Sequence, residues 1–163
     1  MSEPEPLTQP RPNQGNGEPF DWFLRIPNRL ELMKPIRDLI AATCHSHGVD
    51  EEIRQELLLA VSEIVNNSIE HVRGRGEGGY HEVEVTFGVG PEEIVGRIRD
   101  EGEGGISEAD FDGAIVPSLD SDRGRGLLLI KAYVDELHVS NVKGGGTEIL
   151  FRKRRAAAGG GSA

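Results

Sequence analysis

Cysteine is almost absent from this 163-residue sequence, which contains only Cys44. A single thiol cannot form an intramolecular disulfide, and without a cluster of Cys and His residues it is not part of a zinc site. Long apolar runs are also absent: none approaches the roughly 20 residues that a membrane-spanning helix needs, and no basic segment leads into an apolar one at the N-terminus. We therefore expect a cytoplasmic protein with no membrane partner, in which Cys44 lies on the buried side of a helix.

Basic residues are outnumbered, with 18 Lys and Arg against 28 Asp and Glu and a formal net charge of −10. A surface of this sign repels polyphosphate backbones, so no nucleic-acid partner is expected. The basic stretch at residues 152–155 could suggest one, but the pattern favours a frayed strand end that leads into a tail. At this length, 36% hydrophobic residues suffice for one core and not for two, which predicts one compact domain.

The two ends of the chain differ in composition from its middle. Residues 1–19 are rich in Pro, Gly, Gln and Glu and contain almost nothing apolar, so they are predicted to form a disordered N-terminal arm. Residues 154–163, with the run AAAGGGSA, are predicted to form a disordered C-terminal tail. The folded domain is expected to cover residues 20–153.

Hydrophobic periodicity predicts the elements of that domain, because apolar residues recur at helical spacing in three segments and alternate in the others. Their order is neither the alternation of a parallel α/β protein nor an all-β pattern. It predicts an α+β fold, in which a mixed, mostly antiparallel sheet has helices packed on one face. The predicted elements are strand 22–27, helices 36–47 and 51–73, strands 81–88 and 93–100, a long loop at 101–123, helix 127–134, and strands 137–142 and 148–151.

The second predicted helix carries polar residues beside its apolar stripe. Glu63 and Asn67 lie four residues apart and therefore on one face, and Glu70 follows on the next turn. A carboxylate and an amide at the margin of a buried face are costly unless they bind something. Asn67 offers an oxygen ligand that suits Mg²⁺, and Glu63 could deprotonate a hydroxyl that attacks a phosphate. An ordinary amphipathic helix with a solvated flank explains the same residues.

Glycines follow the predicted strand at 93–100. In the sequence DEGEGG, Asp100 ends the strand, and Gly102 and Gly104 come next. A buried Asp at a strand end can accept a hydrogen bond from an exocyclic amine such as that of adenine, and glycines let a ring approach the backbone. A plain turn after an edge strand explains the pattern equally well.

A second glycine-rich segment, DRGRGLLLI, leads into the last predicted helix. Gly124 and Gly126 precede Leu127 at the helix start, where backbone N–H groups form an anion site. Arg123 and Arg125 add charge suited to phosphate. A glycine-rich linker before a core helix is the alternative interpretation.

The remaining candidates are a loop and two side chains. The aperiodic stretch at 101–123 is predicted to act as a mobile lid. Thr147 begins the final strand after three glycines, and its hydroxyl could reach a nucleobase or a bound water; a hairpin with loose glycines is the alternative. His71 could contact the same site or only end the second helix.

Taken in order, ELLLAVSEIVNNSIEH, DEGEGG, DRGRGLLLI and GGGTEI resemble the N box, G1 box, G2 box and terminal G-T motif of the GHKL superfamily of ATPases. The resemblance covers residues 22–151, and four motifs in the right order are more specific than any one alone. Within the superfamily, the chain is most similar to the anti-sigma factor serine/threonine kinases, in length and in the text VSEIVNNSIEH. The resemblance implies their two-layer Bergerat fold.

The resemblance also implies roles for these residues. Glu63 corresponds to the general base and Asn67 to the ligand of Mg²⁺, while Asp100 accepts the adenine amino group. Further contacts to ATP are implied for Glu70, His71, Gly102, Gly104, Gly124, Gly126, Leu127 and Thr147, and contact with the γ-phosphate for Arg123 or Arg125. In the family, the γ-phosphate goes to a serine of a STAS-domain anti-anti-sigma protein. The kinase, usually a homodimer, otherwise holds a sigma factor inactive.

The sequence departs from the family pattern at two places. Gly105 follows the G1 box where the family more often has an aliphatic residue, and Arg123 and Arg125 are shifted from the position expected for the lid arginine.

A non-catalytic, nucleotide-dependent adaptor that sequesters a partner is the alternative to a kinase. A histidine-kinase fragment is not favoured, because no upstream helix with a phosphoacceptor His precedes the domain, and His45 and His47 are expected to face solvent.

Overall fold

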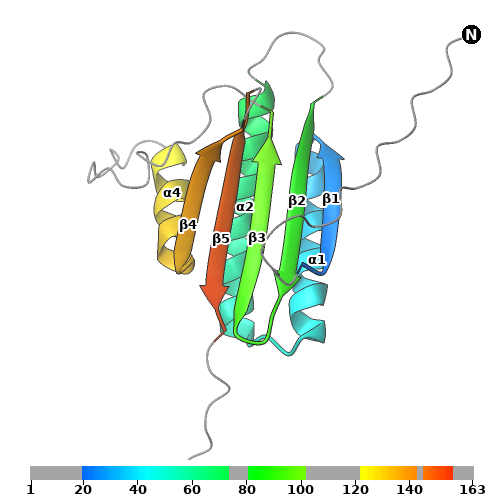
Figure 1. Ribbon diagram of the computed structural model, residues 1–163, viewed down its shortest axis with the longest axis vertical. Coiled ribbons are helices and arrows are strands. Elements are labelled where there is room, and N and C mark those ends of the chain that lie inside the picture. The colour runs from blue at the N-terminus through cyan, green and yellow to red at the C-terminus, as the bar shows by residue number, and fades with distance from the viewer. Residues whose placement is uncertain (1–19, 74–80, 102–121, 143–144, 156–163) are drawn as a thin grey trace, which may run out of the picture.

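A computed structural model describes residues 20–73, 81–101, 122–142 and 145–155 (Figure 1). For residues 71–73, 122–125 and 127 it describes the backbone alone. The predicted N-terminal arm, Gly102, Gly104, Gly105, nearly all of the predicted lid and the last eight residues of the predicted tail lie outside the described residues. The elements are β1 (Trp22–Pro27), the 3₁₀ turn η1 (Leu30–Leu32), α1 (Met33–Ser46), α2 (Glu51–Arg73), β2 (Glu82–Val89), β3 (Glu93–Asp100), α4 (Asp122–Tyr133), β4 (Glu136–Asn141) and β5 (Thr147–Arg154).

The strands form one five-stranded sheet in the order β1-β2-β3-β5-β4. Each of the four neighbouring pairs is antiparallel, so the described sheet is antiparallel throughout. The three helices lie against one face of it, which confirms the predicted two-layer α+β fold (Figure 1). Within the described part of the chain, no helix is both long and apolar enough to cross a membrane.

The helix boundaries differ from the prediction at two starts. α1 begins at Met33 and includes Pro35, which is tolerated because N–H groups in the first turn have no intrahelical partner. α2 starts directly after Asp50, whose carbonyl accepts a hydrogen bond from the Arg54 amide at 2.9 Å. α4 begins at Asp122, five residues before the predicted start, because the pattern showed only its apolar part.

The core lies between the sheet and the helices and follows from the alternation of inward and outward residues along the strands. In β5, for example, every second residue from Thr147 to Lys153 is buried. Cys44 is fully buried on α1, as predicted, and its burial raises the pKa of the thiol from 9.0 to about 11. The thiol is therefore protonated and unreactive at neutral pH. The largest fully buried side chains are Ile36, Ile40, Leu57, Ile64, Ile69, Phe87, Ile94, Ile98, Ile130, Ile149 and Phe151.

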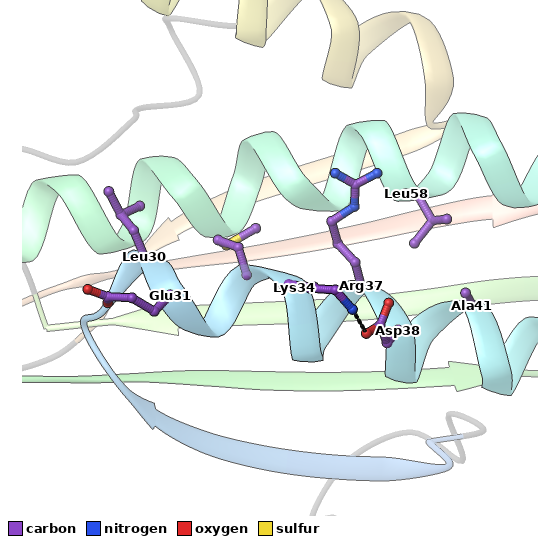
Figure 2. A pocket seen from close by; sticks show the side chains of 8 residues that line it. Leu30, Glu31, Lys34, Arg37, Asp38, Ala41 and Leu58 are labelled. Atoms are coloured by element: carbon purple, nitrogen blue, oxygen red, sulfur yellow. Dashed lines mark hydrogen bonds and ion pairs between the residues drawn. The ribbon is translucent and has the colours of Figure 1, made fainter.

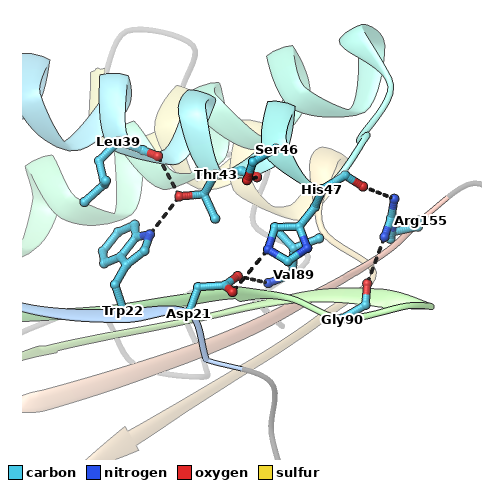
Figure 3. Close-up of polar contacts among 9 residues, drawn as sticks. All are labelled: Asp21, Trp22, Leu39, Thr43, Ser46, His47, Val89, Gly90 and Arg155. Carbon is cyan, nitrogen blue, oxygen red and sulfur yellow. Dashed lines mark hydrogen bonds and ion pairs between the residues drawn. The ribbon is translucent and has the colours of Figure 1, made fainter.

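Polar contacts fasten the end of α1 to the sheet (Figure 3). The Asp21 carboxylate accepts a hydrogen bond from the Val89 amide at 2.8 Å and lies 3.1 Å from Nε2 of His47. Arg155 donates to the carbonyls of Gly90, at 3.1 Å, and of His47, at 2.7 Å. The first and last described segments of the chain therefore meet at the turn between α1 and α2.

The basic stretch at residues 152–155 is part of this ordered structure. β5 continues through Arg154, three residues past the predicted strand end. Arg152 forms an ion pair with Glu93 at 2.7 Å, and Lys153 is 8% exposed. Composition alone suggested a frayed end, but pairing with β3 along its full length keeps this strand regular.

Candidate nucleotide-binding site

Asp100 and Thr147 are neighbours at one end of the sheet. Asp100 is the last residue of β3 and Thr147 the first of β5, and the two are paired in the antiparallel register. Both are polar and only 3% exposed. In Figure 1 the end of β3 and the start of β5 lie at the same end of the molecule as the C-terminal end of α2. The predicted adenine-recognition residues are therefore brought together by strand pairing.

Gly146 lets the backbone before β5 lie close to the backbone at the end of β3. Its φ is +113°, and a Cβ at this position would run into the carbonyl oxygen of Asp100 and lie 3.0 Å from Cα of Glu101. Only glycine combines this backbone conformation with such a close approach. The three glycines before Thr147 were predicted as a loose hairpin or a ligand contact, and a required close approach was not foreseen.

Glu63 and Asn67 lie on the C-terminal half of α2, as predicted. Asn67 is 7% exposed, and among the described residues its Nδ2 has no hydrogen-bond partner. Buried polar groups are almost always hydrogen-bonded, so an orphaned amide marks a place for a ligand. Glu63 is partly exposed, and Glu70, one turn beyond Asn67, is exposed.

Gly126 of α4 packs directly on the Glu63 carboxylate. A Cβ on Gly126 would lie 2.5 Å from Glu63 Oε2 and 3.3 Å from its carboxyl carbon. The glycine therefore lets α4 approach α2 at the point where the carboxylate lies. Gly124 and Gly126 fall inside the first turns of α4 rather than before it, because the helix starts at Asp122. Their role in an anion site stays a prediction.

The remaining predicted site residues cannot be compared with the structure. Gly102 and Gly104 lie outside the described residues. For His71, Arg123, Arg125 and Leu127 only the backbone is described, at the end of α2 and the start of α4. Their roles stay predictions.

The contact between Gly126 and Glu63 leads to a prediction. Gly126→Ala is expected to leave the fold intact, because the added methyl meets the flexible end of a side chain and not backbone. It should displace the carboxylate and lower any phosphate transfer that depends on Glu63 by about tenfold or more, since small misplacements of reacting groups are costly. Transfer rate and melting temperature, measured on the same preparations, test this. An unchanged rate with a lowered melting temperature would be the opposite result.

A separate hollow of about 490 Å³ lies between α1 and α2 (Figure 2). It contains none of the predicted site residues, so it is distinct from the nucleotide site. Lys34 and Asp38 form an ion pair of 2.6 Å along its edge. Its lining comprises Leu30, Glu31, Met33, Lys34, Arg37, Asp38, Ala41 and Leu58.

The described residues fit ATP and Mg²⁺. An Asn amide can turn by 180° without changing shape, so the orphaned end of Asn67 can offer N–H to a phosphate oxygen or a carbonyl oxygen to Mg²⁺. The buried Asp100 and Thr147 provide an acceptor and a hydroxyl at the sheet edge. The described residues thus include polar groups suited to the adenine and others suited to the phosphates with Mg²⁺.

Comparison with known proteins identifies the class. Residues 26–153 match the family described as Histidine kinase-like ATPase domain, and the chain belongs to that family. This confirms the resemblance to the GHKL superfamily that the four motifs indicated.

Two individual proteins of known name are similar to the chain. The chain is similar to the serine-protein kinase RsbW of Bacillus subtilis, with 28% identity over 131 residues that cover 74% of this chain and 78% of the relative. It is also similar to RsbW of Oceanobacillus iheyensis, with 27% identity over 132 residues that cover 77% and 82%.

Two solved structures share the fold. The SiaB-SiaC complex from Pseudomonas aeruginosa matches with a TM-score of 0.62 and 16% identity, over 83% of this chain and 89% of that one. The RsbU and RsbW domains of Rv1364c from Mycobacterium tuberculosis match with a TM-score of 0.56 and 18% identity, over 83% of this chain. The present chain spans 33% of the latter protein.

Proposed function

We propose that this chain is an ATP- and Mg²⁺-dependent serine kinase of the partner-switching type. Its substrate is a serine of a STAS-domain anti-anti-sigma protein, and its second partner is a sigma factor that it holds inactive as a homodimer. The observation that carries the proposal is the buried amide of Asn67, which has no hydrogen-bond partner among the residues that the structure describes. It lies one helical turn from a carboxylate that lies against Gly126 of α4. The names of the two RsbW relatives, both serine-protein kinases, support the same reaction.

Glu63 is the general base in this proposal. Its carboxylate takes the proton of the attacking serine hydroxyl, whose oxygen bonds to the γ-phosphorus while the bond to the bridging oxygen breaks and ADP leaves. The carboxylate is partly exposed, so a partner's serine can approach it from solvent. Gly126 limits its movement from the side of α4.

The other residues bind and orient the nucleotide. Asp100 and Thr147 hold the adenine, while the first turns of α4 offer backbone N–H groups to the phosphates. Asn67 holds Mg²⁺, which neutralises phosphate charge when bound. Arg123 and Arg125 are candidates for contact with the γ-phosphate.

Calorimetry with ATP and the purified protein tests the binding step. We expect ATP binding that tightens when Mg²⁺ is added, and a loss of that gain in Asn67→Ala, because the metal ligand is removed. Asn66→Ala is the matched control, since the neighbouring amide lies on a different part of the helix surface and is less buried. Absence of any heat of ATP binding, with or without Mg²⁺, would overturn the proposal.

Radiolabelled ATP distinguishes the kinase from a nucleotide-dependent adaptor. Transfer of label to a serine of a STAS-domain protein supports the kinase. Tight ATP–Mg²⁺ binding without transfer to any candidate protein would favour the adaptor. The contact of Glu63 with Gly126 favours the kinase, because an adaptor needs no restrained carboxylate at this position.

A further inference from the structure

One face of α2 carries more than the two predicted site residues. Glu56, Ala60, Glu63 and Asn67 are spaced by four, three and four residues, which places them in one row along the helix. Ala60, between the two glutamates in this row, is fully buried. The predicted site is therefore the C-terminal half of a longer row of residues.

α4 runs antiparallel to this row. Gly126 lies on Glu63, and the carbonyl of Tyr133, at the end of α4, shares a hydrogen-bond donor with Glu56. Seven residues separate the two contact points on each helix, which is two turns on both. The two contacts thus define a single register of α4 on α2, and each depends on the other.

The shared donor is Lys153, a buried cation outside the predicted site. It occupies an inward position of β5 and is 8% exposed. Its Nζ donates to Oε2 of Glu56 at 2.8 Å and to the carbonyl oxygen of Tyr133 at 2.7 Å. A buried ammonium is costly unless its hydrogen bonds are made, and a cation at the C-terminal end of a helix is favoured by the helix dipole. Lys153 therefore requires both partners to stay in place.

The described side chains of α4 differ in how deeply they are buried. Ile130 is fully buried, but Leu128 is 49% exposed. Asp135, two residues after the helix end, is bound to β5 as well: its amide donates to the Arg152 carbonyl at 2.9 Å, and the Arg154 amide donates to its carboxylate at 2.6 Å. The C-terminal end of α4 is thus tied to both α2 and β5.

We propose that Lys153 is a positioning residue that sets the register of α4 on α2 and so holds Gly126 against Glu63. Its partner Glu56 lies two helical turns from Glu63 on α2, and its hydrogen bonds within the described part of the chain go to Glu56 and Tyr133, neither of which is a predicted site residue. Its effect on transfer rests on the proposed kinase function, whereas its effect on the register does not.

The test uses the full chain with spin labels on cysteines introduced at Leu59 and Leu128, which are 44% and 49% exposed on the two helices. The native Cys44 is buried and protonated, so it is not expected to react with the label. In Lys153→Met, the distribution of label separations is expected to broaden or shift. Arg152→Met is the matched control, because it removes the neighbouring cation from the outward face of the same strand and should leave the distribution unchanged.

Transfer kinetics give the second readout. With folded sites counted by the stoichiometry of ATP binding, Lys153→Met is expected to lower kcat about tenfold or more and to leave KM for ATP nearly unchanged, since misplacement affects the transition state most. General destabilisation would lower the number of sites and not kcat per site. Glu56→Gln, a milder change, should give a smaller effect in the same direction and no further loss when combined with Lys153→Met.

The outcomes separate the two proposals. An unchanged label distribution in both Lys153→Met and Glu56→Gln would overturn the positioning role, and so would a wild-type kcat per site or additive effects in the double variant. An altered distribution in a protein whose wild type transfers no phosphate would retain the register role and remove the kinase function. If Lys153→Met does not fold, Glu56→Gln is judged by the same two readouts.

Discussion

Glu63→Gln is expected to lower the rate of phosphate transfer to the partner serine by at least about 100-fold, the usual contribution of a general base. Glutamine has the shape of glutamate and fits against Gly126 in the same way, so the packing of α4 on α2 should be retained. It cannot take the proton of the attacking hydroxyl. Binding of ATP–Mg²⁺ should therefore change little, because in the proposed mechanism this carboxylate contacts the hydroxyl and not the nucleotide.

Label transfer from ATP and calorimetric ATP binding, measured on the same preparation, test this prediction. Glu52→Gln provides the control, since it removes a carboxylate from the exposed first turn of the same helix, far from the site. A Glu63→Gln variant that transfers phosphate at the wild-type rate would exclude Glu63 as the base. Loss of ATP binding together with transfer would show instead that the carboxylate serves the nucleotide.

The elements with strong periodicity could be predicted from the sequence. β3 was predicted at its observed bounds because Ile94 and Ile98 fall on one face of an extended segment that ends at Asp100. α2 was predicted in full because Asp50 marks its start and an apolar stripe continues to its end. Local pattern determines both, so no knowledge of neighbouring elements was needed.

The contacts between distant elements could not be predicted in this way. Gly126 is unfavourable in a helix on propensity, yet it lies inside α4, at a point where an added Cβ would displace the Glu63 carboxylate. Lys153 was predicted to belong to a frayed strand end, yet it is buried, because Glu56 and the carbonyl at the end of α4 accept hydrogen bonds from its ammonium group. Both facts depend on packing between segments that are 20 or more residues apart in the chain, which periodicity does not encode.

The pairing of Asp100 with Thr147 could be predicted only in part from the sequence. Each residue was predicted as a candidate because of its place at a strand end. Only the family resemblance implied that the two lie near each other in one site. The structure gives the physical reason: β5 folds back beside β3, so the end of one strand meets the start of the other. A glycine at 146 is part of that arrangement.

Gly146→Ala is expected to be the most damaging single methyl addition in the candidate site. The φ of +113° is unfavourable for alanine, and the new Cβ would collide with the Asp100 carbonyl and lie 3.1 Å from its carbonyl carbon. These are backbone atoms of a paired strand and cannot rotate away as a side chain can. Strain and overpacking together should lower the free energy of unfolding by about 3 kcal/mol.

Gly48→Ala separates the two causes, because Gly48 also has a positive φ, of +68°, but nothing lies within 4 Å of the Cβ that would be added. It should cost about 1 kcal/mol, from backbone strain alone. Urea unfolding followed by Trp22 fluorescence gives both values, and calorimetry gives ATP affinity. Only Gly146→Ala should weaken ATP binding, since it forces β3 and β5 apart where Asp100 and Thr147 are paired. Equal losses of stability in the two variants, with ATP affinity intact in both, would mean that the close approach of Gly146 to β3 has no part in binding the nucleotide.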